Sequence, residues 1–208
     1  DKLTAEGVLG VILLGKADEV KAAAKETGFN IDKCQIIDPE QYADIDAMVD
    51  EMVTLRKGKM TPEQVRDALS KSNYFGTMLV KMGKADCLLG GATYSTADTV
   101  RPALQLIKTK PGNKIVSSCF IMVKGDKKLA MGDCAINIAP NEDELAEIAI
   151  ETAKTAKIFG IDPKVAMLSY STYGSGKGEM VTLMANATKK VKEMAPDLDI
   201  DGELQFDA

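Results

Sequence analysis

The chain has 208 residues, in which 26 Lys and Arg residues stand against 31 Asp and Glu residues for a formal net charge of −5. This acidic balance argues against a general nucleic-acid surface, which needs a clustered basic excess, and no apolar run is long enough to span a bilayer. Histidine is absent, which excludes Ser-His-Asp and Cys-His mechanisms and most zinc sites. The length allows one large domain or two small ones.

The first half of the chain predicts strands that alternate with helices. Val8–Leu14 is a nearly continuous apolar run, which is typical of a strand buried on both faces. Gly28 marks a helix end and Thr61-Pro62 a helix start. The predicted elements that follow are a helix over Lys16–Thr27, a strand over Gln35–Ile37, an amphipathic helix over Tyr42–Leu55, a helix from Thr61, a helix over Phe75–Met82, a strand over Cys87–Leu89 and a helix that carries Arg101.

The stretch Lys110–Lys114, which contains Pro and Gly, is the expected domain boundary, so we expect domains over 1–112 and 113–208. Beyond it, the apolar runs Ile115–Val123 and Leu129–Ile138 flank Gly125-Asp126-Lys127, which predicts a hairpin. The later elements are a helix opened by a capping box at Asn141 and ended before Gly160, a strand over Val165–Leu168, a helix over Glu179–Met194 and a last strand that begins at Leu204–Phe206. Repeated strand–helix units predict an α/β fold with a mostly parallel sheet between helices.

Cysteine usage indicates a reducing compartment. The chain has four cysteines, none in a C-x-x-C pair and all in apolar runs. We therefore expect buried free thiols, a cytoplasmic protein and no metal site built on them. The four are Cys34, Cys87, Cys119 and Cys134.

The segment Gly83–Lys110 has the strongest functional pattern. A strand, a glycine pair and a hydroxyl-rich loop lead into a helix, whose N-terminus offers free N–H groups to an anion. Ser95, Thr96 and Thr99 add hydroxyls, and Arg101 adds a planar fork that suits phosphate oxygens. From spacing alone a simple turn with a capped helix is favoured, because neither a Walker lysine nor G-x-G-x-x-G is present.

A second hydroxyl-rich loop, Ser169–Gly176, follows a predicted strand and precedes a helix. Ligands of open α/β sheets bind outside the carboxyl ends of strands. The loop is therefore either a second phosphate or substrate contact or a flexible connection, and the sequence favours neither. Its candidate residues are Ser171, Thr172, Gly174 and Ser175.

Other charged groups have ordinary explanations. Arg56 stands at a predicted helix end, where a cation complements the helix dipole and is usually solvated. Asp201 and Glu203 are near Gly202, and turn chemistry accounts for them. We assign neither carboxylate as a catalytic base.

Several long runs, in the same order, resemble the phosphate acetyltransferases (phosphotransacetylases) and cover nearly all of Leu55–Ala208. They are LRKGKMTPEQ (Leu55–Gln64), NYFGTMLVKMGKAD (Asn73–Asp86), GKADCLLGGATYSTADTVRPALQLIKT (Gly83–Thr109), DCAINIAPN (Asp133–Asn141), AEIAIETAKTAKIFGIDPKVAMLSYSTYGS (Ala146–Ser175) and DGELQFDA (Asp201–Ala208). The resemblance implies two three-layer α/β/α domains with an interdomain cleft, in a fold like isocitrate dehydrogenase. It also implies a homodimer with its contact mainly in the second domain, around Ile148–Phe159.

The reaction implied by this resemblance joins acetyl-CoA and phosphate to give CoA and acetyl phosphate, with CoA as a substrate and no cofactor or metal. In the family an aspartate deprotonates the CoA thiol, the thiolate attacks the acetyl carbonyl in a ternary complex, and phosphate leaves. Arginines bind the phosphate and a serine stabilises the transition state. Arg56 and Arg101 match family arginines of the cleft, which the loop Ser169–Gly176 also faces.

Members of the family continue beyond DGELQFDA, with a serine-arginine pair and the catalytic aspartate, and they begin before DKLTAEG. We therefore expect an internal portion of the enzyme, with no catalytic residue assigned within it and no activity from residues 1–208 alone. Two alternatives stay open. One is a phosphate butyryltransferase or related phosphotransacylase, such as an ethanolamine-utilisation acetyltransferase. The other is a non-catalytic acetyl-CoA-sensing domain like that of some malic enzymes.

Overall fold

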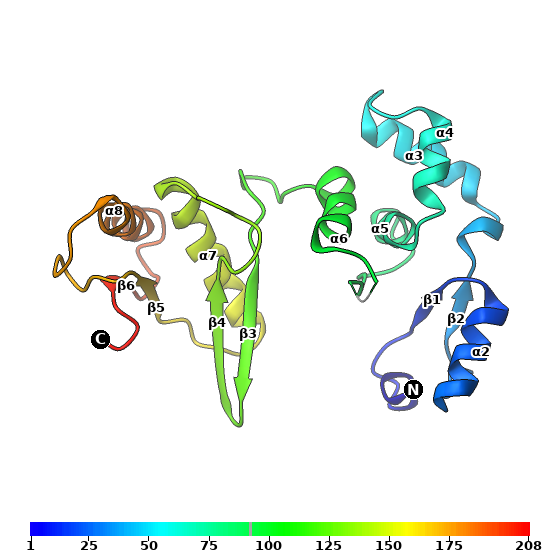
Figure 1. Ribbon diagram of the computed structural model, residues 1–208, viewed down its shortest axis with the longest axis horizontal. Coiled ribbons are helices and arrows are strands. Elements are labelled where there is room, and N and C mark those ends of the chain that lie inside the picture. Colours follow the sequence, from blue (N-terminus) through cyan, green and yellow to red (C-terminus); the bar gives the residue numbers. More distant parts are fainter. Residues whose placement is uncertain (92) are drawn as a thin grey trace. The chain divides into compact units, whose positions relative to one another are not determined.

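The computed structural model describes residues 1–91 and 93–208, which form two compact units, Asp1–Lys108 and Thr109–Ala208 (Figure 1). Ala92, inside the predicted glycine turn, lies outside the described residues. The division falls after Lys108, whose φ of 68° ends the last helical segment of the first unit. The sequence placed the boundary slightly later, between residues 112 and 113.

The first unit joins one small sheet to a group of helices (Figure 1). Strand β1 (Ile12–Leu14) pairs in parallel with β2 (Gln35–Ile37), and Leu13 lies opposite Ile36. The helical elements are α1 (Lys2–Ala5), α2 (Ala17–Thr27), the 3-10 turn η1 (Pro39–Gln41), α3 (Ile45–Arg56), α4 (Pro62–Leu69), α5 (Ser72–Lys81), α6 (Thr96–Pro102) and the π-helical segment η2 (Ala103–Ile107).

Local signals in the sequence set several of these boundaries. Gly28 adopts a φ of 73° at the end of α2, a conformation that costs glycine little. Thr61 opens α4 with a capping box: its Oγ1 accepts from the Gln64 N–H at 3.3 Å, and Gln64 Oε1 accepts from the Thr61 N–H at 2.9 Å. Two orphan N–H groups of the helix start are thereby satisfied.

The core of the first unit lies where α3, α4, α5 and η2 meet. Its fully buried side chains are Met48, Met52, Val65, Leu69, Phe75, Met78 and Leu106. Each buried large apolar side chain contributes about 1.5–3 kcal/mol. Leu88 packs over Gly76 of α5, where an added Cβ would meet its side chain at 2.7 Å. This contact anchors the segment that leads to α6.

Two strand predictions in this unit are wrong in extent or kind. The predicted strand Val8–Leu14 is a strand only over Ile12–Leu14, and Val8 is 65% exposed. Cys87–Leu89 forms no strand, and Leu89 is 96% exposed. An apolar run becomes a strand only where a neighbour completes its hydrogen-bond ladder, and no described segment pairs with this one.

The second unit contains an antiparallel hairpin and a parallel pair of strands (Figure 1). Strand β3 (Cys119–Lys124) pairs with β4 (Lys127–Gly132) across the two-residue turn Gly125-Asp126, which confirms the predicted hairpin with shorter strands. The parallel strands are β5 (Val165–Leu168) and β6 (Ile200–Leu204), and the helices are α7 (Glu142–Ile158) and α8 (Glu179–Met194).

Helices α7 and α8 pack on the parallel strands. The buried residues of this core are Ala146, Ala149, Met167, Ala187, Val191 and Ile200. The predicted capping box is confirmed, since Asn141 Oδ1 accepts from the Glu144 N–H at 3.0 Å and Glu144 Oε2 accepts from the Asn141 N–H at 2.9 Å. Lys190 of α8 pairs with Glu142 at 2.8 Å and with Asp143, and so links the two helices.

The last strand lies earlier than predicted. It runs over Ile200–Leu204, not from Leu204 onward, because Ile200 fills the core and pairs with Val165 at the start of the ladder. Asp201-Gly202 therefore belongs to a strand, and the turn expected there is wrong. The α/β class is confirmed, while the described residues form three two-stranded sheets rather than one larger sheet.

Burial also corrects two expectations. Cys87 is exposed and the other three cysteines are half-buried, so fully buried thiols are wrong, although all four are free. The region Ile148–Phe159, expected to contact a partner, is divided: Ile148 is buried inside its unit, whereas Ile158 is 80% exposed.

The hairpin has an exposed apolar face formed by Phe120, Met122, Leu129 and Met131. Nowhere along the described residues is there a helix with the length and apolar character needed to cross a membrane.

Candidate functional site

The start of α6 uses two of its candidate hydroxyls for the helix itself. Ser95 is the N-cap: its Oγ accepts from the Asp98 N–H at 3.1 Å and donates to Asp98 Oδ2 at 2.8 Å. Thr99 Oγ1 donates to the Ser95 carbonyl at 3.0 Å. Thr96, at the first helical position, is exposed. The capped-helix interpretation therefore describes Ser95 and Thr99 in this structure.

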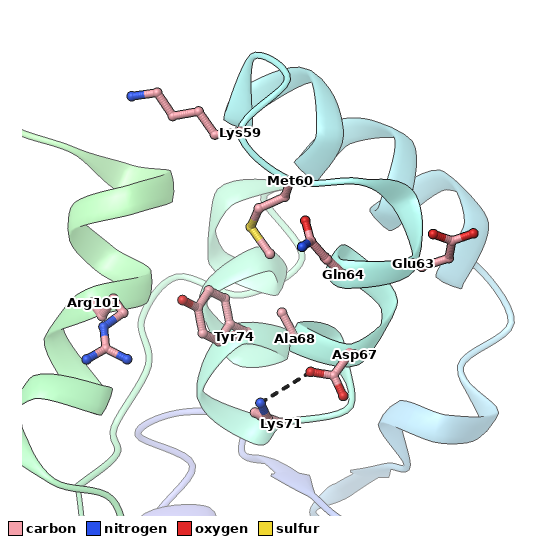
Figure 2. A pocket seen from close by; sticks show the side chains of 9 residues that line it. All are labelled: Lys59, Met60, Glu63, Gln64, Asp67, Ala68, Lys71, Tyr74 and Arg101. Atoms are coloured by element: carbon pink, nitrogen blue, oxygen red, sulfur yellow. Dashed lines mark hydrogen bonds and ion pairs between the residues drawn. The ribbon is translucent and has the colours of Figure 1, made fainter.

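Arg101 extends from α6 over a shallow groove of about 620 Å³ that α4 and α5 also line (Figure 2). Its Nη1 lies 3.2 Å from Asp98 Oδ1, and the side chain is 55% exposed. An exposed pair of this kind is worth only about 0–1 kcal/mol, so an anionic ligand can compete for the guanidinium. The other lining residues are Lys59, Met60, Glu63, Gln64, Asp67, Ala68, Lys71 and Tyr74.

The groove is mixed in charge. Lys59, Lys71 and Arg101 line it together with Glu63 and Asp67, and Lys71 Nζ lies 3.4 Å from Asp67 Oδ2. The sequence predicts Arg101 at this site. It missed Lys71 and Tyr74, because only the packing of α5 against α6 brings them beside Arg101. Tyr74 lies in the resemblance block that begins at Asn73, to which no role is assigned, and Lys71 lies outside the resemblance blocks.

Arg56 is the last residue of α3 and does not line this groove. Its Nε is buried and, among the described residues, has no hydrogen-bond acceptor. An unsatisfied buried donor typically costs about 1–3 kcal/mol, more in a charged group. That Arg56 lies in the same cleft as Arg101, as the family resemblance implies, stays a prediction.

The loop Ser169–Gly176 joins β5 to α8 and is tied down by hydrogen bonds. Ser171 is fully buried, and its Oγ donates to Glu203 Oε1 at 3.1 Å and accepts from the Gly176 N–H at 3.0 Å. The Gly174 N–H donates to the same Glu203 oxygen at 2.6 Å, and Gly174 has a φ of 78°. This part of the loop is therefore folded around a carboxylate of β6.

The other two candidate residues of the loop bond mainly to their surroundings in the same unit. The Thr172 N–H donates to Ser175 Oγ at 3.0 Å. The Gln205 N–H donates to Thr172 Oγ1 at 2.9 Å, and that hydroxyl lies 3.3 Å from Gln205 Oε1. These bonds argue against a loosely held connection.

Two carboxylates beside the loop are held in their charged forms. The Gly174 N–H, the backbone N–H of Glu203 itself and the Ser171 hydroxyl lower the pKa of Glu203. The Tyr173 hydroxyl, Lys192 and the Gly202 N–H lower the pKa of Asp201 to about 2, and Asp201 in turn raises the pKa of Tyr173. Hydrogen bonds to the charged form act in this direction. This role of Glu203 is not visible in the sequence, since its partners lie about 30 residues earlier.

Comparison with known proteins covers the whole chain. The family model described as "Phosphate acetyl/butaryl transferase" matches residues 1–208. A phosphate acetyltransferase of Bacillus subtilis is 53% identical over 207 residues, which are 100% of this chain and 64% of the relative. A chain titled as a phosphotransacetylase from Streptococcus pyogenes superposes with a TM-score of 0.92 at 52% identity, covering 100% of this chain and 64% of that one.

A second solved structure has a more specific title. The EutD phosphotransacetylase from Staphylococcus aureus superposes with a TM-score of 0.85 at 48% identity, covering 94% of this chain and 61% of that one. The chain thus spans about three fifths of the length of these relatives.

Proposed function

Because the chain belongs to the phosphate acetyl/butaryl transferase family, we propose that it is part of an enzyme that transfers an acetyl group between CoA and inorganic phosphate. The thiolate of CoA attacks the carbonyl of acetyl phosphate, the new C–S bond forms, and phosphate leaves; the reverse direction makes acetyl phosphate. The observation that carries this proposal is the 53% identity to a phosphate acetyltransferase across the full chain.

The described residues support the phosphate side of this chemistry. A phosphate that leaves or attacks needs its charge neutralised, which suits planar guanidinium groups. Arg101 lies over a groove with two lysines, and the buried Nε of Arg56 lacks an acceptor in the described part of the chain. We propose both as phosphate or substrate contacts, with Ser95, Thr96 and Thr99 near Arg101.

The thiol side needs a base. A CoA thiol with a pKa of about 8.5 is mostly protonated at neutral pH. Glu203 and Asp201 have lowered pKa values and hydrogen-bonded oxygens, so neither is suited to take that proton. That no catalytic base lies within these residues stays a prediction.

Other features stay predictions of the family resemblance. These are the two three-layer domains with a cleft like that of isocitrate dehydrogenase, substrate contact by Ser171, Thr172, Gly174 and Ser175, the homodimer, the cytoplasmic location and catalysis without a cofactor. The inactivity of residues 1–208 by themselves also stays a prediction.

The test is an acyl-transfer assay on the protein at its full gene-encoded length, with acetyl-CoA and butyryl-CoA as competing donors to phosphate. We expect kcat/KM for acetyl-CoA to be the larger, because the relatives at about 50% identity are named for acetyl transfer. Each methylene in an apolar pocket changes the preference by only about 1–3 kcal/mol. A larger value for butyryl-CoA would favour a butyryltransferase, and binding of acetyl-CoA without turnover would favour a sensor domain.

A further inference from the structure

Glu203 occupies the place that a bound anion takes in many glycine-rich loops. Its side chain is buried, with 5% of the residue exposed, and two donors of one loop meet at its Oε1, from Ser171 and Gly174. Backbone N–H groups of successive loop residues form such concave anion sites for phosphate. Here a carboxylate of the chain fills the position permanently.

The backbone of Glu203 and its neighbours strengthens the same connection. The Tyr173 N–H donates to the Glu203 carbonyl at 3.2 Å, and the Ser169 N–H donates to the Leu204 carbonyl at 2.8 Å. Strand β6 therefore holds both the start and the middle of the loop. Tyr170 and Tyr173 remain 60% and 66% exposed on the outside of this framework.

We propose that Glu203 is a positioning residue. Its carboxylate fixes the Ser169–Gly176 loop at the carboxyl end of β5, so that the exposed side chains of the loop meet substrate in one arrangement. This inference rests on the proposed acyl transfer, because it assigns the loop to that substrate site. The charge is the important property, since hydrogen bonds to an ionised acceptor are about twice as strong as neutral ones. Glutamine has the same shape and lacks that charge.

The test compares Glu203→Gln with the wild type in the protein at its full gene-encoded length. We expect the Gly174 amide to exchange its hydrogen at least about tenfold faster, because a hydrogen bond to a charged group is typically worth more than one between neutral groups. We expect kcat/KM for acetyl transfer to fall about tenfold, chiefly through a higher KM, because a misplaced loop weakens substrate binding. The exchange of the α7 amides should not change.

Glu193→Gln is the matched control, because Glu193 is an exposed glutamate on α8. It should change neither readout. If Glu203→Gln left the Gly174 exchange rate at the wild-type value, Glu203 would not hold the loop. If exchange accelerated while kcat/KM and KM stayed unchanged, the loop would not contact substrate, and the proposal would be overturned.

Ser171→Ala provides a second variant in case Glu203→Gln does not fold. It removes one donor to the same carboxylate and leaves the Gly174 donor in place, and it should raise KM in the same direction. The double variant should be less than additive, because both changes break one contact; full additivity would contradict the proposal. If the wild type showed no acyl transfer, the proposed function would fail and the loop would lose its assigned substrate, while the exchange data would still report whether Glu203 holds it.

Discussion

The segment that opens α6 and the loop that follows β5 both bring Ser, Thr and Tyr side chains to the approach of a helix. At α6 the Ser95 hydroxyl caps the helix, the Thr99 hydroxyl donates back to the Ser95 carbonyl, and the cation Arg101 stays half-exposed over an open groove. After β5 the donors of Ser171 and Gly174 already share a buried carboxylate. The comparison teaches that similar loop compositions can leave a charge available to a ligand or use an internal charge to fix a shape.

If this contrast is correct, Arg101→Ala should have the largest effect on activity and little effect on stability. We expect kcat/KM for acetyl transfer to fall about a hundredfold, as for loss of one transition-state donor, with Tm almost unchanged because its ion pair is exposed. Arg101→Lys should recover only part of the rate, since the fork geometry is lost. Steady-state kinetics with Arg66→Ala as the control would check this, because Arg66 forms a comparable exposed pair with Asp46. Wild-type kinetics for Arg101→Ala would remove Arg101 from the site.

After β5, in contrast to Arg101→Ala, Ser171→Ala should lower stability as well as raise KM. We expect the free energy of unfolding to fall by about 2 kcal/mol, because a buried hydrogen bond to a charged group is lost. Urea denaturation followed by circular dichroism measures this change. Ser70→Ala is a suitable control, since Ser70 is exposed and donates only to the Asp67 carbonyl. If the two variants lost equal amounts of unfolding free energy, the expected difference between the buried and the exposed serine would be wrong.

Ser95→Ala should cost less, about 1 kcal/mol, which is typical of a lost helix N-cap. The same denaturation experiment measures it, and Ser95→Asp should restore most of the loss because Asp is also a good cap. A loss as large as that of Ser171→Ala would show that Ser95 does more than cap α6.

The smallest expected effect is a pH dependence of the loop after β5. Asp201 has its pKa lowered from 3.8 to about 2 by the Tyr173 hydroxyl, Lys192 and the Gly202 N–H. A lowered folded-state pKa adds stability above the unfolded value, and this contribution is lost as the pH falls through about 4 to 2. Asp201→Asn should therefore show a shallower loss of stability than the wild type between pH 5 and about 2 in urea titrations. Parallel curves would contradict the assigned interactions.

Local structure was largely predictable from the sequence, because its signals lie within a few residues. The helix start at Thr61, the capping box at Asn141, the stop at Gly28 and the hairpin turn at Gly125 all depend on neighbours in the chain. The failures involve distant partners. Cys87–Leu89 is as apolar as a strand but has no described partner, and the sequence does not show which segments will pair.

The residues of the candidate site also separate into those that a local pattern predicts and those that depend on distant parts of the chain. Arg101 and the cap Ser95 could be found from a local pattern, and the family resemblance gave Arg101 a chemical role. Lys71 and Tyr74 became neighbours of Arg101 only through helix packing. From the sequence, the common turn residue Gly202 predicts turn chemistry for Glu203, whereas its actual partners lie on a loop that precedes it by an entire helix.

The long separation between Glu203 and its loop has a consequence for the order of folding. The β3–β4 hairpin closes over a two-residue turn and can form in about 1–10 μs. The contact between Ser171 and Glu203 spans 32 positions, so the chain must first close a long loop, at an entropic cost that grows with length. During synthesis from the N-terminus, the loop after β5 leaves the ribosome before its carboxylate. Its shape is therefore acquired late, when β6 adds to β5.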